Sequence, residues 1–224
     1  MGLRLFLKGF LTYGVRALRG KALALVLMGA PAWAEPVTVL AFGDSLTQGY
    51  GLPAEDGFVP KLQDWLVAHG DEVTLINGGV SGDTTAGGAA RVEWSLTPEV
   101  DAMIVALGGN DVLRGIAPEI ARTNLTSILE VAASRDLPVL LVGLPAPGNY
   151  GAQYKAAFDA IYPDLAEQFD VLYLQSFFTG LGEGQPSELQ EFFQADGIHP
   201  NAEGVTQIVE GMGPIVQELI GEIE

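Results

Sequence analysis

Five short apolar runs, separated by longer stretches with helical periodicity, constrain the fold of this chain more than any other feature of the sequence. Each run is rich in β-branched or aliphatic residues and nearly free of polar side chains, which is typical of strands covered on both faces. The runs occupy residues 37–42, 73–76, 102–107, 139–144 and 171–174.

Helical patterns fill the intervals between the runs and follow the last one. They are expected over residues 58–69, 84–94, 118–135, 154–169 and 201–220. Regular alternation of strand and helix indicates a parallel sheet joined by right-handed crossovers. We therefore predict an α/β fold, a three-layer α/β/α sandwich with a central, mostly parallel five-stranded sheet. In such sheets, ligands bind beyond the carboxyl ends of the strands.

The first 34 residues differ in composition from the rest. They hold five basic residues and no acidic one, and an apolar run over 22–30 leads into Ala32, Trp33 and Ala34. This is the pattern of a signal peptide, and the apolar run is far short of the roughly 20 residues that span a bilayer. We predict a signal peptide over 1–34, cleaved after Ala34, and one domain over 35–224. The product is expected in the periplasm or secreted, without stable membrane insertion once the leader is removed.

Charge and cysteine content exclude several classes of partner. Of the 11 basic and 28 acidic residues in the chain, the predicted domain keeps six basic and all the acidic ones, a formal charge of −22. Phosphate binding needs a basic footprint, so this charge argues against nucleic acid. The chain has no cysteine, which leaves no disulfide framework and no acylated-cysteine anchor.

A serine follows the first apolar run directly, in the segment FGDSLTQG at 42–49. Ser45 thus stands at a strand end, after a glycine and ahead of a helix, where a substrate carbonyl can approach. The same residue types form ordinary strand-to-helix turns. The segment alone therefore leaves catalysis and a plain turn both open.

A serine nucleophile needs a general base, and the chain holds only two histidines. His69 ends a helical run just before Gly70, a position where histidine commonly interacts with the last helix carbonyls. His199 lies in DGIHPN at 196–201, where Gly197 lets Asp196 turn back to the imidazole. A carboxylate on one ring nitrogen leaves the other free to accept the serine proton. We predict a structural role for His69 and a catalytic one for His199 with Asp196.

Acyl transfer also requires hydrogen-bond donors for the oxyanion. The segment NGGVSGDT at 77–84 follows the second run, and GGND at 108–111 follows the third. Their glycines allow close approach of backbone N–H groups, and Asn110 adds a side-chain amide. From these residues alone, Gly78, Gly79 and Gly82 all remain candidates, and both segments also favour turns.

Taken in order, the four segments resemble the blocks of the SGNH hydrolases, also called GDSL esterases, whose fold is of the flavodoxin-like type. The extended strings at 43–47, 81–84, 108–111 and 196–201 are most similar to the bacterial periplasmic group of thioesterase I, lysophospholipase and arylesterase enzymes. The resemblance implies a catalytic triad of Ser45, His199 and Asp196. It also implies an oxyanion hole of the Ser45 N–H, the Gly82 N–H and the Asn110 side chain.

The expected reaction is hydrolysis of aryl or acyl esters, lysophospholipids and acyl thioesters through an acyl-enzyme, with no cofactor and no metal. A carbohydrate O-deacetylase on the same fold would use the same catalytic residues. The loop at 144–150 and the Phe177–Phe178 region are the expected pocket walls, and an apolar lining would favour an acyl chain over a sugar. An exported binding protein without activity is the non-enzymatic alternative.

Overall fold

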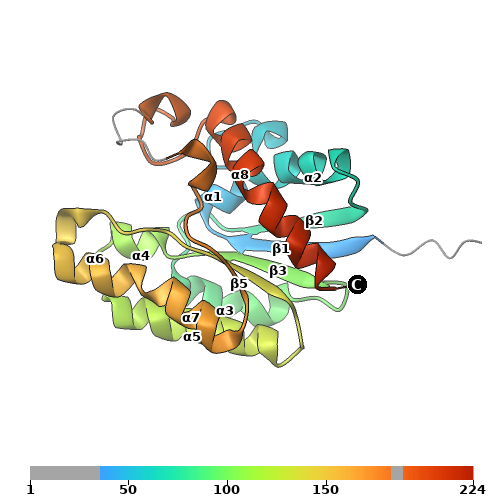
Figure 1. Cartoon of the computed structure of the whole chain (residues 1–224). Helices are drawn as coiled ribbons and strands as arrows, with labels where there is room; N and C mark the ends of the chain where they lie inside the picture. Colours follow the sequence, from blue (N-terminus) through green and yellow to red (C-terminus); the bar gives the residue numbers. More distant parts are fainter. Residues whose placement is uncertain (1–35, 183–188, 224) are drawn as a thin grey trace, which may run out of the picture. The chain divides into compact units, whose positions relative to one another are not determined.

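A computed structural model describes residues 36–182 and 189–223. The predicted signal peptide over 1–34 lies outside the described residues. Five strands form one parallel sheet in the order β2-β1-β3-β4-β5 (Figure 1). They are β1 (Val37–Gly43), β2 (Val73–Gly79), β3 (Ala102–Ala106), β4 (Val139–Val142) and β5 (Leu172–Leu174). The predicted α/β/α sandwich is confirmed.

Helices cover both faces of the sheet. On one face, α2 (Phe58–Ala68) packs against α8 (Ala202–Gly221); on the other, α3 (Thr85–Ser95) packs against α5 (Pro118–Ala133), which also contacts α7 (Ile161–Phe169) (Figure 1). Three shorter helices are α1 (Ser45–Gln48), α4 (Gly109–Leu113) and α6 (Ala152–Asp159). Short 3-10 turns stand at Ala54–Asp56, Gly148–Tyr150, Thr179–Leu181 and Gln190–Phe192.

Strands β3 and β4 are buried along their whole length, as their unbroken apolar composition requires. Leu62 of α2 and Met212 of α8 pack into the core from one face, and Ile128 of α5 and Ile161 of α7 from the other. Burial on both faces fixes the sheet as the rigid base from which the strand ends project.

One predicted helix is wrong in extent. The pattern over 154–169 predicts a single helix, but the chain forms α6 and α7 with a break at Ala160. Pro163 explains the break, because it lacks an N–H and its ring clashes with the carbonyl four residues earlier. In α7 it occupies the first turn, where the missing N–H has no intrahelical partner to lose.

Two helix ends follow the sequence closely. The Asn201 side chain accepts a hydrogen bond from the Gly204 N–H at 2.9 Å and caps α8. His69 follows the last residue of α2, and its Nδ1 donates to the Trp65 carbonyl at 2.7 Å. His69 also stacks on the Trp65 ring, which confirms its structural placement.

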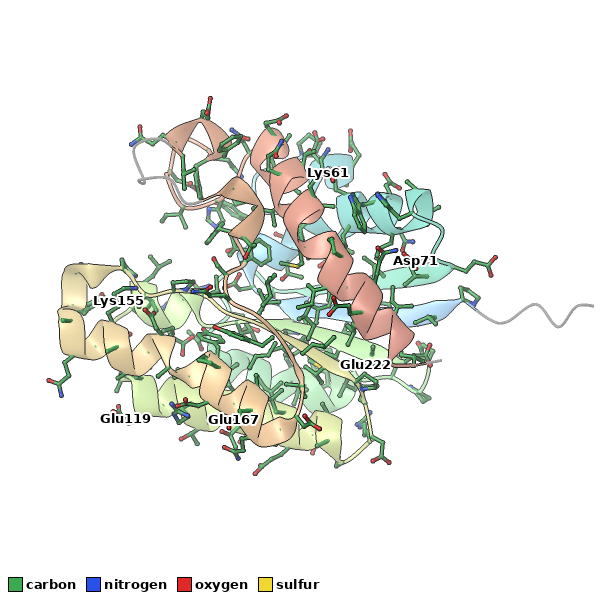
Figure 2. All side chains as sticks on the ribbon, viewed as in Figure 1. Lys61, Asp71, Glu119, Lys155, Glu167 and Glu222 are labelled. Atoms are coloured by element: carbon green, nitrogen blue, oxygen red, sulfur yellow. The ribbon has the colours of Figure 1, made fainter. Side chains whose placement is uncertain are left out.

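Among the described residues, no helix combines the length and the apolar character that crossing a bilayer demands. Charged side chains instead cover the outer faces of the helices, as the labelled Glu119, Glu167 and Glu222 illustrate (Figure 2).

Candidate active site

Ser45 is the first residue of α1, directly beyond the end of β1. Asp44 caps this short helix by accepting a hydrogen bond from the Leu46 N–H at 3.0 Å. Gly43 is required for close packing, because a Cβ there would stand 2.0 Å from the Thr47 hydroxyl. The tight turn presents the Ser45 hydroxyl beyond the carboxyl edge of the sheet, as the sequence predicts.

His199 and Asp196 meet Ser45 from the loop before α8. The Ser45 Oγ lies 2.9 Å from His199 Nε2, and His199 Nδ1 lies 2.7 Å from Asp196 Oδ2. An ionised carboxylate only accepts, so Nδ1 carries the ring proton and Nε2 accepts from the serine hydroxyl. All three predicted triad residues are therefore joined in one hydrogen-bonded chain.

Local hydrogen bonds hold the histidine loop in shape. Asp196 Oδ1 accepts from the Ile198 and His199 N–H groups, and Gly197 takes a φ of +67° that favours glycine. The Gln194 N–H donates to the His199 carbonyl at 2.8 Å and closes the turn. The hydrogen bond from His199, together with those from the two backbone N–H groups, lowers the pKa of Asp196 to about 2. Asp196 is thus an anion wherever the enzyme is expected to work.

The three predicted oxyanion donors surround the same point. Gly82, Asn110 and Ser45 all line the cavity that holds His199. Within the described parts of the chain, the backbone N–H groups of Ser45 and Gly82 donate no hydrogen bond, so both are free for a ligand. Gly82 has a φ of +82°, which only glycine adopts without strain.

The other glycines of the second block serve packing. Gly78 and Gly79 form the end of β2. A Cβ on Gly78 would stand 2.8 Å from a Leu40 methyl, and one on Gly79 would stand 2.3 Å from the Gln48 nitrogen. Proximity to the strand end therefore does not identify the glycine at the cavity, which is Gly82.

Asp44 is buried beside Ser45 with only 2% of its surface exposed. Besides capping α1, it accepts a hydrogen bond from Asn110 Nδ2 at 3.2 Å. Burial raises its pKa from 3.8 to about 6, although the hydrogen bonds from Leu46 and Asn110 oppose that rise. Asp44 therefore connects the segment at 42–49, which carries Ser45, to the segment at 108–111, which carries Asn110.

Arg91 of α3 connects the segment at 42–49 to the segment at 77–84. Its Nε donates to Asp83 at 2.7 Å, and its Nη2 donates to the Gly43 carbonyl at 2.9 Å. The guanidinium also lies 3.9 Å over the Phe42 ring. Because Asp83 adjoins Gly82 and Gly43 lies two positions before Ser45, this one buried side chain links the two segments that carry the predicted backbone oxyanion donors.

The cavity above Ser45 has a volume of about 550 Å³. Its walls are mainly apolar, and none of its lining residues in the described part of the chain is a lysine or arginine. Tyr50 covers the outer face of His199, with ring centroids 4.6 Å apart. The apolar lining residues are Leu46, Val112, Leu113, Leu144, Pro145, Pro147, Phe178, Phe193 and Ile198.

A model of the GDSL-like Lipase/Acylhydrolase family matches residues 41–206. The chain belongs to this family. Esterase TesA of Pseudomonas aeruginosa is 38% identical to this GDSL-like hydrolase over 199 residues, covering 88% of this chain and 96% of that protein. The Escherichia coli thioesterase 1/protease 1/lysophospholipase L1 is 36% identical over 185 residues, covering 82% and 85%. The crystal structure of AlinE4, an SGNH-hydrolase family esterase, is 42% identical, covers 83% of this chain and 97% of that chain, and has a TM-score of 0.68.

These similarities confirm the SGNH resemblance and establish the chain as a carboxylic ester hydrolase. The likeness to a solved SGNH esterase agrees with the parallel sheet found here. The binding-protein alternative is not supported.

Sequence reasoning gave no role to several residues of this GDSL-like hydrolase that surround the site. Asp44 carried a signal, since it is an acidic residue directly before Ser45 at the end of an apolar run. Tyr50 and the bond of Arg91 to the Gly43 carbonyl carried none, because these partners lie 149 and 48 residues apart in the chain. The Leu144–Tyr150 and Phe177–Phe178 walls were anticipated, and Leu144, Pro145, Pro147 and Phe178 do line the cavity.

Proposed function

We propose that this protein hydrolyses acyl and aryl esters, lysophospholipids among them, and acyl thioesters by a two-step mechanism in which Ser45 is the nucleophile. The observation that carries the proposal is the chain of hydrogen bonds from Ser45 through His199 to Asp196 at the base of an apolar cavity. This arrangement supplies a nucleophile, a base and an orienting carboxylate in contact.

In the first step the Ser45 hydroxyl oxygen attacks the substrate carbonyl carbon while His199 Nε2 takes the hydroxyl proton. Asp196 stabilises the imidazolium that forms. The carbonyl oxygen becomes an oxyanion that accepts from the Ser45 N–H, the Gly82 N–H and Asn110 Nδ2. The C–O or C–S bond then breaks, the leaving alcohol or thiol takes the proton from His199, and an acyl-Ser45 ester remains.

In the second step His199 Nε2 takes a proton from water, and the resulting hydroxide equivalent attacks the acyl-Ser45 carbonyl. The same three donors stabilise the second oxyanion. Cleavage of the ester bond to Ser45 releases the carboxylic acid, and the proton on His199 returns to the serine oxygen. No cofactor or metal takes part in either step.

The cavity favours an acyl chain over a sugar as the group that is bound. Its lining is mainly aliphatic, aromatic and proline side chains, with the polar groups confined to the reacting end. A carbohydrate O-deacetylase would need polar groups along the walls to pair with sugar hydroxyls. The lysophospholipase and thioesterase activities in the name of the Escherichia coli relative also agree with an acyl-chain substrate.

The test is a panel of nitrophenyl esters from acetate to palmitate, with acyl-CoA and acetylated xylan, measured for the wild type and for Ser45→Ala. Turnover of the nitrophenyl esters that disappears in Ser45→Ala supports the proposal. Turnover that survives in Ser45→Ala refutes the mechanism, and activity on acetylated xylan alone would identify a deacetylase.

Export is a separate part of the proposal. A basic start, an apolar run and a small-residue site over 1–34 support cleavage after Ala34 and a periplasmic or secreted enzyme. The mature protein then begins at Glu35, which N-terminal sequencing of the native product would detect. A product retaining residues 1–34 would contradict it.

A further inference from the structure

The wall of the active-site cavity formed by residues 144–147 has very few backbone hydrogen bonds of its own. Pro145 and Pro147 have no N–H, so Ala146 carries the one backbone donor between Leu144 and Gly148. Yet Ala146 is buried, and Leu144, Pro145 and Pro147 line the cavity above Ser45. Something outside the segment must satisfy the Ala146 peptide and hold the wall in position.

Two charged residues of α6 do this together. Asp159 Oδ1 accepts a hydrogen bond from the Ala146 N–H at 2.7 Å. Lys155 Nζ donates to the Ala146 carbonyl at 2.6 Å. The same ammonium contacts Asp159 Oδ2 at 2.7 Å. A single ion pair therefore binds both the N–H and the carbonyl of Ala146. Figure 2 labels Lys155, which belongs to α6.

The wall also separates two cavities. A second cavity of about 300 Å³ lies behind it, lined by Lys155, Asp159 and Tyr162 among others. Leu144 and Pro145 line both this cavity and the one that holds Ser45. If the Ala146 peptide were released, the wall would have space to retreat into, and the room for an acyl chain would grow.

We propose that the Lys155–Asp159 pair determines acyl-chain specificity by holding the Ala146 peptide and thereby the position of the 144–147 wall. The proposal rests on the proposed ester hydrolysis and adds the residues that set its chain-length range. Neither side chain lines the cavity above Ser45, so both are positioning residues that act through the wall. Both side chains are partly exposed, so the ion pair contributes little to the free energy of unfolding. A change in specificity can therefore be measured in variants that still fold.

The experiment compares Lys155→Met, Asp159→Ala and the double variant with the wild type. For each, kcat/KM is measured on nitrophenyl acetate and nitrophenyl decanoate, and the decanoate-to-acetate ratio is calculated. The net worth of one typical hydrogen bond predicts that this ratio rises about threefold to tenfold. The double variant should match the single ones, because either loss releases the same peptide.

A charge exchange, Lys155→Asp with Asp159→Lys, distinguishes the hydrogen bonds to the Ala146 backbone from the ion pair itself. The exchanged pair keeps opposite charges one helical turn apart, but its carboxylate and ammonium no longer face the matching groups of Ala146. The exchange should therefore raise the ratio as the double variant does. A wild-type ratio in the exchanged protein would overturn the proposal.

The control is the ion pair between Arg122 and Asp164, which is similarly exposed and, among the described residues, forms no hydrogen bond to the wall. Arg122→Met and Asp164→Ala should leave the ratio unchanged. Equal ratios in the Lys155, Asp159 and control variants would overturn the wall's dependence on the pair, even with ester hydrolysis intact. Failure of the proposed function would look different, since the wild type itself would then hydrolyse neither ester. Thermal melts of every variant show that each measurement is made on folded protein.

Discussion

Asp44 Oδ2 accepts a hydrogen bond from Asn110 Nδ2 at 3.2 Å, although the two residues lie 66 positions apart in the chain. The ionised carboxylate cannot donate, so it fixes which side of the Asn110 amide carries the nitrogen. One N–H of that amide donates to Asp44, which leaves the other N–H for a ligand in the cavity that Asn110 lines. The buried carboxylate thus orients Asn110, the proposed oxyanion donor, beside Ser45, the proposed nucleophile.

The Asn110 amide is predicted to act mainly on the transition state. Asn110→Ala should lower kcat on a nitrophenyl ester by about 10²- to 10³-fold, the typical effect of losing one oxyanion donor. KM should change little, because the ground-state carbonyl is bound weakly by this group. Asn110→Asp is the matched variant of nearly equal size, and a kcat close to the wild type in either variant would exclude the assigned role.

Asp44 makes stability depend on pH. Burial raises its pKa from 3.8 to about 6, so the folded protein binds this proton more tightly than the unfolded chain does. Its contribution is therefore present in full below pH 3.8 and is lost as the pH rises through about 6. Between pH 7 and pH 4.5 the wild type should gain about 2 kcal/mol of unfolding free energy relative to Asp44→Asn. Urea titrations at both values measure the difference, and equal differences at the two pH values would contradict the prediction.

Arg91 is expected to stabilise the fold and the site together. Its side chain and that of Asp83 are 10% and 15% exposed, so Arg91→Met leaves a mostly buried carboxylate without its partner. Removal of one partner of such a pair costs about 3 kcal/mol of unfolding free energy. Arg122→Met, which breaks an exposed pair, should cost less than about 1 kcal/mol. Chemical denaturation of the two variants should rank them in that order, and equal costs would argue against the buried link.

Asp196 is expected to affect kcat through its negative charge and through its hydrogen bond with His199 Nδ1. Asp196→Asn leaves an amide next to Nδ1 and permits the wrong tautomer, so kcat should fall by about 10²- to 10⁴-fold at pH 7. The pKa of Asp196 is lowered to about 2, so its protonation does not limit the wild type between pH 4 and pH 8. A kcat for Asp196→Asn within a factor of two of the wild type would rule out the orienting role.

The sequence predicts the sheet and the four site segments well because both depend on local patterns. A short unbroken apolar run such as Ala102–Ala106 removes all its side chains from water only as a strand that is covered on both faces. Parallel strands then bring their carboxyl ends to one edge, so Ser45 and Asn110 meet without any further information. Asp196 and His199 are also predictable, since they stand only three positions apart across a turn at Gly197.

Other features depend on contacts between distant segments and have no local signature. The ion pair of Lys155 with Asp159 looks like an ordinary helix-surface pair until the Ala146 peptide is seen between them. Burial of Asp44 is decided by α4 packing over it, and its raised pKa follows from that packing. The break at Ala160 was missed because the apolar periodicity continues across it, although Pro163 gives a local reason for it.

The central claim is that Ser45 carries the acyl group during turnover. The most direct measurement treats the protein with a fluorophosphonate, which transfers a phosphonyl group to an activated serine, and maps the adduct by mass spectrometry of the digested chain. The account predicts one phosphonyl group per molecule on the peptide that contains Ser45, loss of esterase activity in step with labelling, and no adduct in Ser45→Ala. An adduct on another residue, or full esterase activity in the fully labelled protein, would contradict it.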